Sequence, residues 1–150
     1  MSNIRGYHGS TTLFWTYDEH HRIVVLMGKR SRHPAYGCWS FAGGTWEQKD
    51  GYDTHGRPNY IHTAIREASE EVGITIKEPK KLVLLWKLKL PFFRYLSFAY
   101  YIPEKIEPSH VSEFSHTRWV DLDKLPLLSV VFVYHQVRLL KKHVKKTASE

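Results

Sequence analysis

The chain has 150 residues, of which 42% are hydrophobic and 14% aromatic, so it can bury one substantial core but not two. Lysine and arginine outnumber aspartate and glutamate by 22 to 15, and the net charge of +7 favours polyanionic partners such as nucleotides or nucleic acid. The single cysteine, Cys38, excludes an internal disulfide. Residues 1–10 lack the apolar core of a signal peptide, and the longest apolar run, 125–134, is too short to cross a bilayer. We therefore expect one soluble domain, residues 1–150, in the reducing cytoplasm and with no membrane partner.

The first part of the chain predicts two strands followed by a long loop. Residues 10–17 and 22–29 are rich in β-branched and aromatic side chains, and the polar residues 18–21 separate them as a hairpin turn would. Residues 30–60 are rich in Gly, Pro, Asp, His and Arg and contain only the short apolar piece 38–42. This composition predicts mostly loop.

A helix is predicted from Tyr60 onward. Its apolar residues recur at helical spacing: Ile61, Ala64, Ile65, Ala68 and Val72. Asn59 is suited to cap the start, and Gly73 to the left-handed position past the end. We expect about three helical turns.

The second half predicts more strands and a terminal helix. Residues 81–90 and 92–102 have the composition of two strands joined at Pro91, and a polar loop over 103–116 precedes a short strand at 117–120. Val130, Val133, Val137, Leu140 and Val144 follow a helical spacing near the end of the chain. The order of elements predicts an α/β or α+β sandwich.

The stretch "REASEEVGI" (66–74) concentrates acids on the predicted helix. Glu67, Glu70 and Glu71 lie at i, i+3 and i+4, so we expect their carboxylates to share one face that lines a surface or cleft. At about 5 Å apart they repel by roughly 3 kcal/mol per pair at an effective dielectric near 20. Most acidic helix faces of this kind are simply exposed to solvent. If this face is not, a hard divalent cation, Mg²⁺ or Mn²⁺, is the simplest partner for its carboxylates.

The same stretch resembles the motif of the Nudix hydrolases. The second half of that family's box is Arg-Glu, an apolar residue, any residue, Glu-Glu, any residue, Gly and an apolar residue, and residues 66–74 match every constrained place. The first half is looser, because Ala42 precedes Gly43 and Gly44 where proline is usual, and Asp50 replaces a glutamate. Fifteen residues instead of the usual seven separate Asp50 from Arg66. Since Gly51, Gly56 and Pro58 all precede Asn59, we expect the extra length to lie in a loop that leaves the helix whole.

The resemblance implies an α/β/α sandwich around a mixed sheet and Mg²⁺-dependent cleavage of a nucleoside diphosphate linked to another group. It implies that Glu67, Glu70 and Glu71 hold metal, that the Gly44 carbonyl adds a ligand, and that Arg66 orients the acids. We expect Glu113, in the loop before Trp119, to supply a further acid that takes a proton from the attacking water. Glu67 is the alternative base.

Basic and aromatic residues near the glycine turn are candidates for substrate binding. Lys29, Arg30 and Arg32 can clamp phosphates, although basic residues in loops are more often plain surface, and Trp39 can stack on a base. The insertion 51–58 is expected to border the mouth of the substrate site.

Two functions from different classes follow from these patterns. A small-nucleotide hydrolase, acting on nucleoside triphosphates, including oxidised ones, is favoured by the complete set of arginine and glutamates. A nucleic-acid-binding or regulatory module of the same fold is favoured by the charge of +7 and the altered first half of the box. An RNA-cap hydrolase would combine the two. We favour the nucleotide over nucleic acid as the partner, and the sequence gives no oligomeric state.

Overall fold

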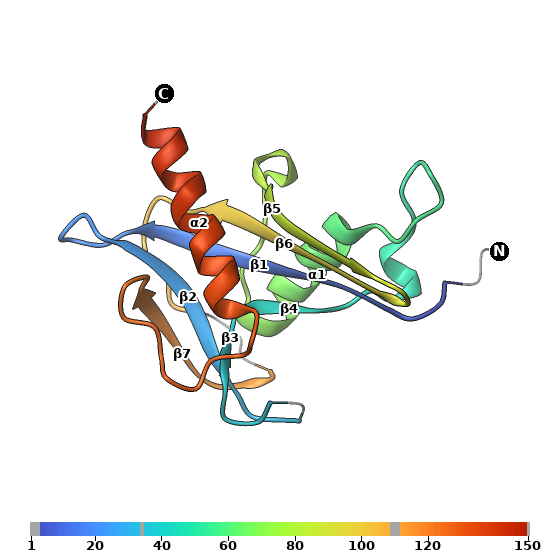
Figure 1. Ribbon diagram of the computed structural model, residues 1–150, viewed down its shortest axis with the longest axis horizontal. Helices are drawn as coiled ribbons and strands as arrows, with labels where there is room; N and C mark the ends of the chain where they lie inside the picture. Colours follow the sequence, from blue (N-terminus) through green and yellow to red (C-terminus); the bar gives the residue numbers. More distant parts are fainter. Residues whose placement is uncertain (1–3, 34, 109–111, 150) are drawn as a thin grey trace.

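The computed structural model describes residues 4–33, 35–108 and 112–149. Within these residues the chain forms seven strands and two α-helices: β1 (Tyr7–Tyr17), β2 (Ile23–Arg30), β3 (Trp39–Ser40), β4 (Ala42–Thr45), α1 (Tyr60–Val72), β5 (Val83–Leu90), β6 (Phe93–Tyr101), β7 (Phe114–Asp121) and α2 (Val133–Ala148). The strands make one mixed sheet in the order β3-β2-β1-β6-β5, with β4 also paired to β1 and β7 to β2 (Figure 1). Short 3₁₀ turns lie at Gln48–Asp50 and Pro79–Lys81.

Strand β1 runs through the centre of the sheet. It pairs antiparallel with β2 and β4 and parallel with β6, where Tyr7 lies opposite Phe93 and Trp15 opposite Tyr101. Side chains alternate between the two faces of a strand, so β1 contributes to two cores, one on each face of the sheet, where the sequence predicted a single core. Leu13 and Trp15 are buried in one core, and Phe14 in the other.

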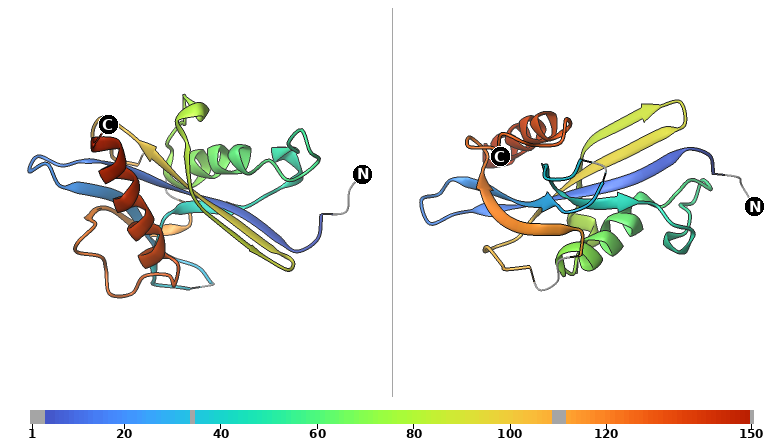
Figure 2. Two further views of the ribbon diagram at one scale, coloured as in Figure 1. Left: turned by 45° about the horizontal axis from the view of Figure 1, so that its top comes forward. Right: turned by 90° about the horizontal axis from the view of Figure 1, so that it is seen from below.

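The two helices cover opposite faces of the sheet, as the right-hand view of Figure 2 shows. Val133, Val137, Leu140 and Val144 of α2 pack with the core that holds Leu13. Ala68 and Val72 of α1 pack with the core that holds Phe14. These layers confirm the sandwich with a mixed central sheet, because each amphipathic helix buries its apolar side on one face of the sheet. None of the helices in the described residues combines the length and apolar character that a bilayer span requires.

Both predicted ends of helix α1 are confirmed. The side chain of Asn59 accepts a hydrogen bond from the backbone N–H of His62 at 3.1 Å. Gly73 adopts the left-handed conformation with φ of 67°. The helix therefore begins and ends where its capping residues require.

Residues 31–59 are mostly loop, as predicted, although two short strands, β3 and β4, form within them. Gly43 faces Thr11 across the β1–β4 pair, and a Cβ atom on Gly43 would collide with the backbone of Ser10 and Thr11. Glycine, which usually weakens a strand, is here required for the close approach. Strand β7 also begins at Phe114, inside the loop predicted over 103–116, and residues 109–111 of that loop lie outside the described residues.

Candidate active site

Helix α1 distributes its three motif acids over different environments. Glu71 is buried, with 2% of its surface exposed, whereas the side chain of Glu70 is 50% exposed. Glu67 lies between these extremes, and a Cβ atom on Gly44 would collide with its carboxylate. The three acids, expected on one helix face that lines a surface or cleft, are therefore buried to different degrees, since Glu71 lies toward the sheet and Glu70 toward solvent.

Arg66 joins these acids to the preceding loop. Its Nη1 donates to Glu67 at 2.9 Å and to Glu70 at 3.0 Å. Its Nε and Nη2 donate to the two carboxylate oxygens of Asp50 at 2.7 and 3.0 Å, and Nη2 also donates to the carbonyl of Thr45 at 2.8 Å. A bidentate pair of this kind fixes the plane of the guanidinium and therefore the position of the carboxylates that it holds.

Asp50 reaches Arg66 although it is shorter than the glutamate expected at this position. It is 5% exposed and accepts hydrogen bonds from Thr63 Oγ1 and the Glu47 backbone N–H, both at 2.9 Å. Burial alone would raise the pKa of Asp50, but the bonds from Arg66, Glu47 and Thr63 outweigh it and hold the pKa below its ordinary value. Asp50 is therefore an ionised anchor for Arg66.

The insertion leaves this anchor undisturbed because its two ends meet. The backbone N–H of Asn59 donates to the carbonyl of Gly51 at 3.0 Å, and Tyr52 bridges to Pro58. The extra residues consequently form a closed loop outside α1, as expected. The expectation that the loop borders the substrate mouth is wrong for the pocket described below, because no residue of 51–58 lines it.

Glu71 is the most perturbed acid of the site. One of its oxygens accepts from the backbone N–H of Gly43 at 3.0 Å, while Oε1 has no hydrogen-bond partner in the part of the chain that the structure describes. Burial, together with the neighbouring carboxylates of Glu67 and Glu113, raises the pKa of Glu71 to about 9. Ionised carboxylates only accept hydrogen bonds, so Glu71 and Glu113 repel unless a proton or a cation lies between them.

A cavity of about 500 Å³ lies beside these acids. Glu67 and Glu113 lie on its wall, and burial together with Glu70 and Glu113 raises the pKa of Glu67 against the opposing effect of Arg66. The backbone of Glu113 is fixed because its carbonyl accepts from Ser31 N–H and Ser31 Oγ, both at 2.9 Å. The structure thus brings Glu113, 46 positions away from Glu67 in the sequence, to the same cavity as Glu67.

The residues expected to bind substrate divide into two groups. Arg30 lines the cavity, whereas Lys29, Arg32 and Trp39 are not among its lining residues. Trp39 instead lies under the guanidinium of Arg118 at 4.7 Å and packs against the α2 core. Several lining residues were not predicted from the sequence, namely Tyr7, Thr11, His33, Ser40 and Tyr95.

Strand alternation was the signal that could have identified part of the missed set. Tyr7 and Thr11 lie on the same face of β1, opposite to the face of Ser10. On β6, Tyr95 comes directly before the residue that pairs with Ser10, so Tyr95 lies on the face of Tyr7 and Thr11. Strand alternation identifies these residues only when the parallel register of β1 and β6 is known, and no local pattern in the sequence specifies that register.

The donor groups suit a hard divalent cation, which prefers oxygen ligands. Glu71 Oε1 is a buried oxygen without a partner, and the Glu67 carboxylate lies against Gly44 at the same end of β4. Across residues 4–33, 35–108 and 112–149, however, no three acidic, histidine or cysteine side chains are already gathered as a metal cluster.

The NUDIX domain profile matches residues 6–140, most of the chain. The chain belongs to the NUDIX family. The match includes β1, the box helix α1 and β7, so the NUDIX assignment rests on the whole sandwich as well as on the acids. A comparison with curated protein sequences found no match.

Solved NUDIX structures share the fold at low sequence identity. A MutT/nudix family protein from Enterococcus faecalis is 17% identical with a TM-score of 0.64, over 81% of this chain but only 46% of its own. The NUDIX domain of Shewanella oneidensis NrtR, complexed with ADP ribose, is 14% identical with a TM-score of 0.66, over 91% of this chain and 86% of its own. A Caenorhabditis elegans Ap4A hydrolase is 17% identical with a TM-score of 0.62, over 92% and 97%. NrtR has also been solved with a 27mer DNA, matching with a TM-score of 0.61 and 17% identity over 93% and 63%.

Proposed function

We propose that this NUDIX protein is a Mg²⁺-dependent hydrolase that cleaves a phosphoanhydride bond of a nucleoside diphosphate-linked substrate. Within that class we propose nucleoside triphosphates, including oxidised ones, which would yield a monophosphate and pyrophosphate. The observation that carries the proposal is the partnerless Oε1 of buried Glu71, which lies near Glu67 and Glu113 at the 500 Å³ cavity. Burying this carboxylate in its ionised form is costly unless a cation or a proton neutralises it.

Each residue of the site has a proposed role. Glu67, Glu70, Glu71 and the Gly44 carbonyl would hold Mg²⁺, or Mn²⁺ in its place, while Arg66 keeps one oxygen of Glu67 and one of Glu70. The bound cation would neutralise phosphate charge and increase the acidity of water. Glu113 would accept the proton from that water, with Glu67 as the alternative base.

Arg66 and Arg30 have supporting roles in this proposal. Arg66, anchored by Asp50, would position the acids without touching substrate. Arg30 lies on the cavity wall, where a guanidinium can bind phosphate oxygens.

A second candidate function is nucleic-acid-dependent regulation or RNA-cap hydrolysis. The likeness to NrtR, solved with ADP ribose and with DNA, and the net charge of +7 favour it. Ala42 and Asp50 also depart from the usual box. This alternative predicts nucleic-acid binding without turnover of small nucleotides, or turnover only of capped RNA.

A substrate panel with product identification separates these functions. We would incubate the protein with the common nucleoside triphosphates, an oxidised deoxyguanosine triphosphate, ADP-ribose, a nucleotide sugar, a diadenosine polyphosphate and capped RNA, each with Mg²⁺ or with EDTA. Phosphorus NMR would identify the products. The proposal predicts pyrophosphate from a triphosphate with Mg²⁺ and none with EDTA.

Other outcomes would redirect the assignment. Preferred turnover of ADP-ribose, the sugar or the dinucleotide would keep the hydrolase and change its substrate class. Turnover of capped RNA alone, or of none of the substrates, would overturn the proposal in favour of the second candidate.

A further inference from the structure

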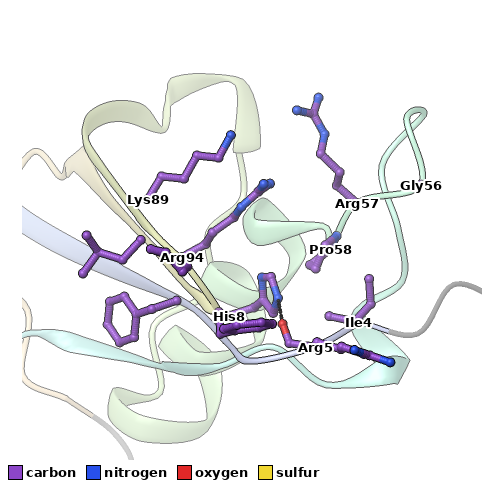
Figure 3. A pocket seen from close by; sticks show the side chains of 12 residues that line it. Ile4, Arg5, His8, Gly56, Arg57, Pro58, Lys89 and Arg94 are labelled. Atoms are coloured by element: carbon purple, nitrogen blue, oxygen red, sulfur yellow. Dashed lines mark hydrogen bonds between the residues drawn. The ribbon is translucent and has the colours of Figure 1, made fainter.

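A second hollow lies at the end of the sheet where the β5–β6 hairpin turns. Its volume is about 600 Å³, and it adjoins a smaller cavity of about 350 Å³ that shares Arg57, Pro58 and Arg94 with it. We name the two together the basic groove, after its cationic side chains: Arg5, Arg57, Lys87, Lys89 and Arg94. In Figure 3 the side chains of Lys89 and Arg94 from the hairpin and of Arg57 from the insertion extend into one space, with Arg5 at its edge.

The basic groove and the candidate active site lie on opposite faces of the same two strands. Tyr7 lines the active-site cavity and His8, the next residue of β1, lines the groove. On β6, Arg94 lines the groove and Tyr95 lines the active-site cavity. Adjacent residues of a strand point to opposite faces, although Phe93, which also lines the groove, lies on the Tyr7 side at the end of β6. No described residue lines both the groove and the active-site cavity, so the groove is a separate site.

Most of the positive charge of the groove is left without an ion pair in the described residues. Lys89 lies opposite Arg94 and Lys87 opposite Leu96 in the β5–β6 register, so both lysines share the face of Arg94. Among the described residues, no acid forms an ion pair with Arg5, Lys87, Lys89 or Arg94. The larger cavity has no acid among its described lining residues, and the smaller has Asp53, which pairs with Arg57 at 3.4 Å. Gathered like charges repel, and a polyanion relieves that repulsion.

The elements that carry these cations are fixed by hydrogen bonds. The Asp53 carboxylate accepts from the backbone N–H groups of His55 and Arg57 at 2.8 and 2.9 Å, which holds the insertion in a tight turn. The backbone N–H of Tyr7 donates to the carbonyl of Phe92 at 2.8 Å and ties the hairpin tip to β1. The groove is therefore preformed, which lowers the entropic cost of binding.

Apolar and aromatic groups complete the groove at the hairpin tip. Phe92 is 70% exposed and borders the larger cavity, where Leu90, Pro91 and Phe93 also lie. The ring of Phe93 is stacked on Tyr7 at 5.0 Å, so Phe92 is the more accessible ring of the pair. An exposed ring beside a line of cations is the arrangement on which unpaired bases stack while their phosphates follow the charges.

We propose that the basic groove binds single-stranded nucleic acid, with phosphates on Arg57, Lys87, Lys89 and Arg94 and a base on Phe92. Two adjoining cavities with shared cations give an extended track, which suits a strand better than a single small anion. The exposed position of Phe92 likewise suits stacking on an open face more than enclosure of a free base. This binding goes beyond the proposed hydrolysis and does not require it.

The test is fluorescence anisotropy with a labelled single-stranded oligonucleotide of about twelve pyrimidines, in EDTA and over a range of salt concentrations. The groove variant is Lys87→Glu/Lys89→Glu, since both side chains are exposed and neither forms an ion pair in the described residues. The matched control is Lys142→Glu/Lys146→Glu on α2, which makes the same change in net charge on the opposite face of the sheet and alters the other lysine cluster.

We expect the groove variant to lose at least about 10-fold in affinity at moderate salt, and the magnitude of its salt slope to fall by about 1 to 2. The control should change the affinity by less than about 2-fold. Phe92→Ala should weaken binding about 10-fold with little change in salt slope. Equal losses in the groove variant and the control would overturn the proposal, because binding would then follow net charge alone.

Competition experiments exclude other occupants. Tripolyphosphate or a mononucleotide that displaces the oligonucleotide at equal concentration would overturn the strand proposal in favour of a small-anion site. Groove-dependent binding to anionic phospholipid vesicles in place of the oligonucleotide would overturn it in favour of a membrane surface. Turnover of nucleotides in the panel assay is unchanged in the groove variant under this proposal, so failure here leaves the hydrolase assignment intact.

Discussion

The candidate active site and the basic groove lie on opposite faces of β1 and β6, and they handle charge in opposite ways. Glu71 in the active site is 2% exposed and next to other acids, so its charge is expensive. The groove cations lie at the surface, where water screens them. The net charge of +7 of the whole chain therefore does not indicate how charge is arranged in either pocket. Large effects per residue are expected in the active site, and small, salt-dependent effects in the groove.

The strongest test of this contrast is removal of charge from the motif acids. Glu70→Gln and Glu71→Gln should each lower the rate of nucleotide hydrolysis at least about 10²-fold, because each removes a proposed metal ligand. Steady-state kinetics at saturating Mg²⁺ would measure the loss. Glu78→Gln, an exposed acid paired only with Lys81 in the described residues, is the control and should keep its rate. Wild-type rates in both motif variants would contradict the metal site.

The Asp50–Arg66 anchor should matter most for stability. Asp50→Asn removes the charge from a buried ion pair and should lower the free energy of unfolding by about 3 kcal/mol. Asp123→Asn, which breaks the exposed contact with Lys141 at 2.7 Å, should cost less than about 1 kcal/mol. Urea unfolding of the two variants compares them directly. Similar losses would mean that burial does not distinguish the two carboxylates.

Glu71 should make the metal-free protein less stable at higher pH. Its pKa of about 9 in the folded protein exceeds the unfolded value, so folding takes up a proton between these two values. The free energy of unfolding should therefore fall as pH rises from 5 to 8, with a contribution from Glu71 on the order of 4 kcal/mol.

Glu71→Gln should remove that contribution and be the more stable protein at pH 8 in EDTA. Unfolding curves of both proteins at pH 5, 6, 7 and 8 supply the measurement. A difference between them that does not change with pH would contradict the raised pKa.

The insertion gives the smallest expected effect on catalysis. Since the carbonyl of Gly51 and the N–H of Asn59 already meet at 3.0 Å, residues 52–58 can be replaced by a short glycine link. Relative kcat/KM values across the nucleotide panel should change by less than about 3-fold, whereas oligonucleotide affinity should fall because Arg57 is lost. An altered nucleotide preference would show that the loop serves the active site after all.

The sequence predicted local structure well where side-chain periodicity and caps determine it. Helix α1 has the predicted caps at Asn59 and Gly73, because both signals are local to the helix end. Strand β4 escaped prediction because its pairing with β1 depends on glycines that permit close backbone approach, and composition alone reads them as loop.

For the site as well, features set by neighbouring residues in the sequence were predictable, whereas features set by contacts between distant elements were not. The spacing of Glu67, Glu70 and Glu71 was visible in the sequence, but the burial of Glu71 was not, because it depends on how α1 packs on β4. The opposite-face placement of Tyr7 and His8 also required the fold, since only the register of β1 with β6 assigns each residue to a cavity.

The central claim, that buried Glu71 belongs to a divalent-cation site, is tested most directly by calorimetry of Mg²⁺ binding at pH 8 in two buffers of different ionisation enthalpy. With a pKa of about 9, Glu71 is mostly protonated at this pH without metal and must lose its proton to bind Mg²⁺. We predict release of nearly one proton per Mg²⁺ from the wild type, and weakened binding without that release in Glu71→Gln. Mg²⁺ binding that releases no proton and is unchanged in Glu71→Gln, or no Mg²⁺ binding at all, would contradict the claim.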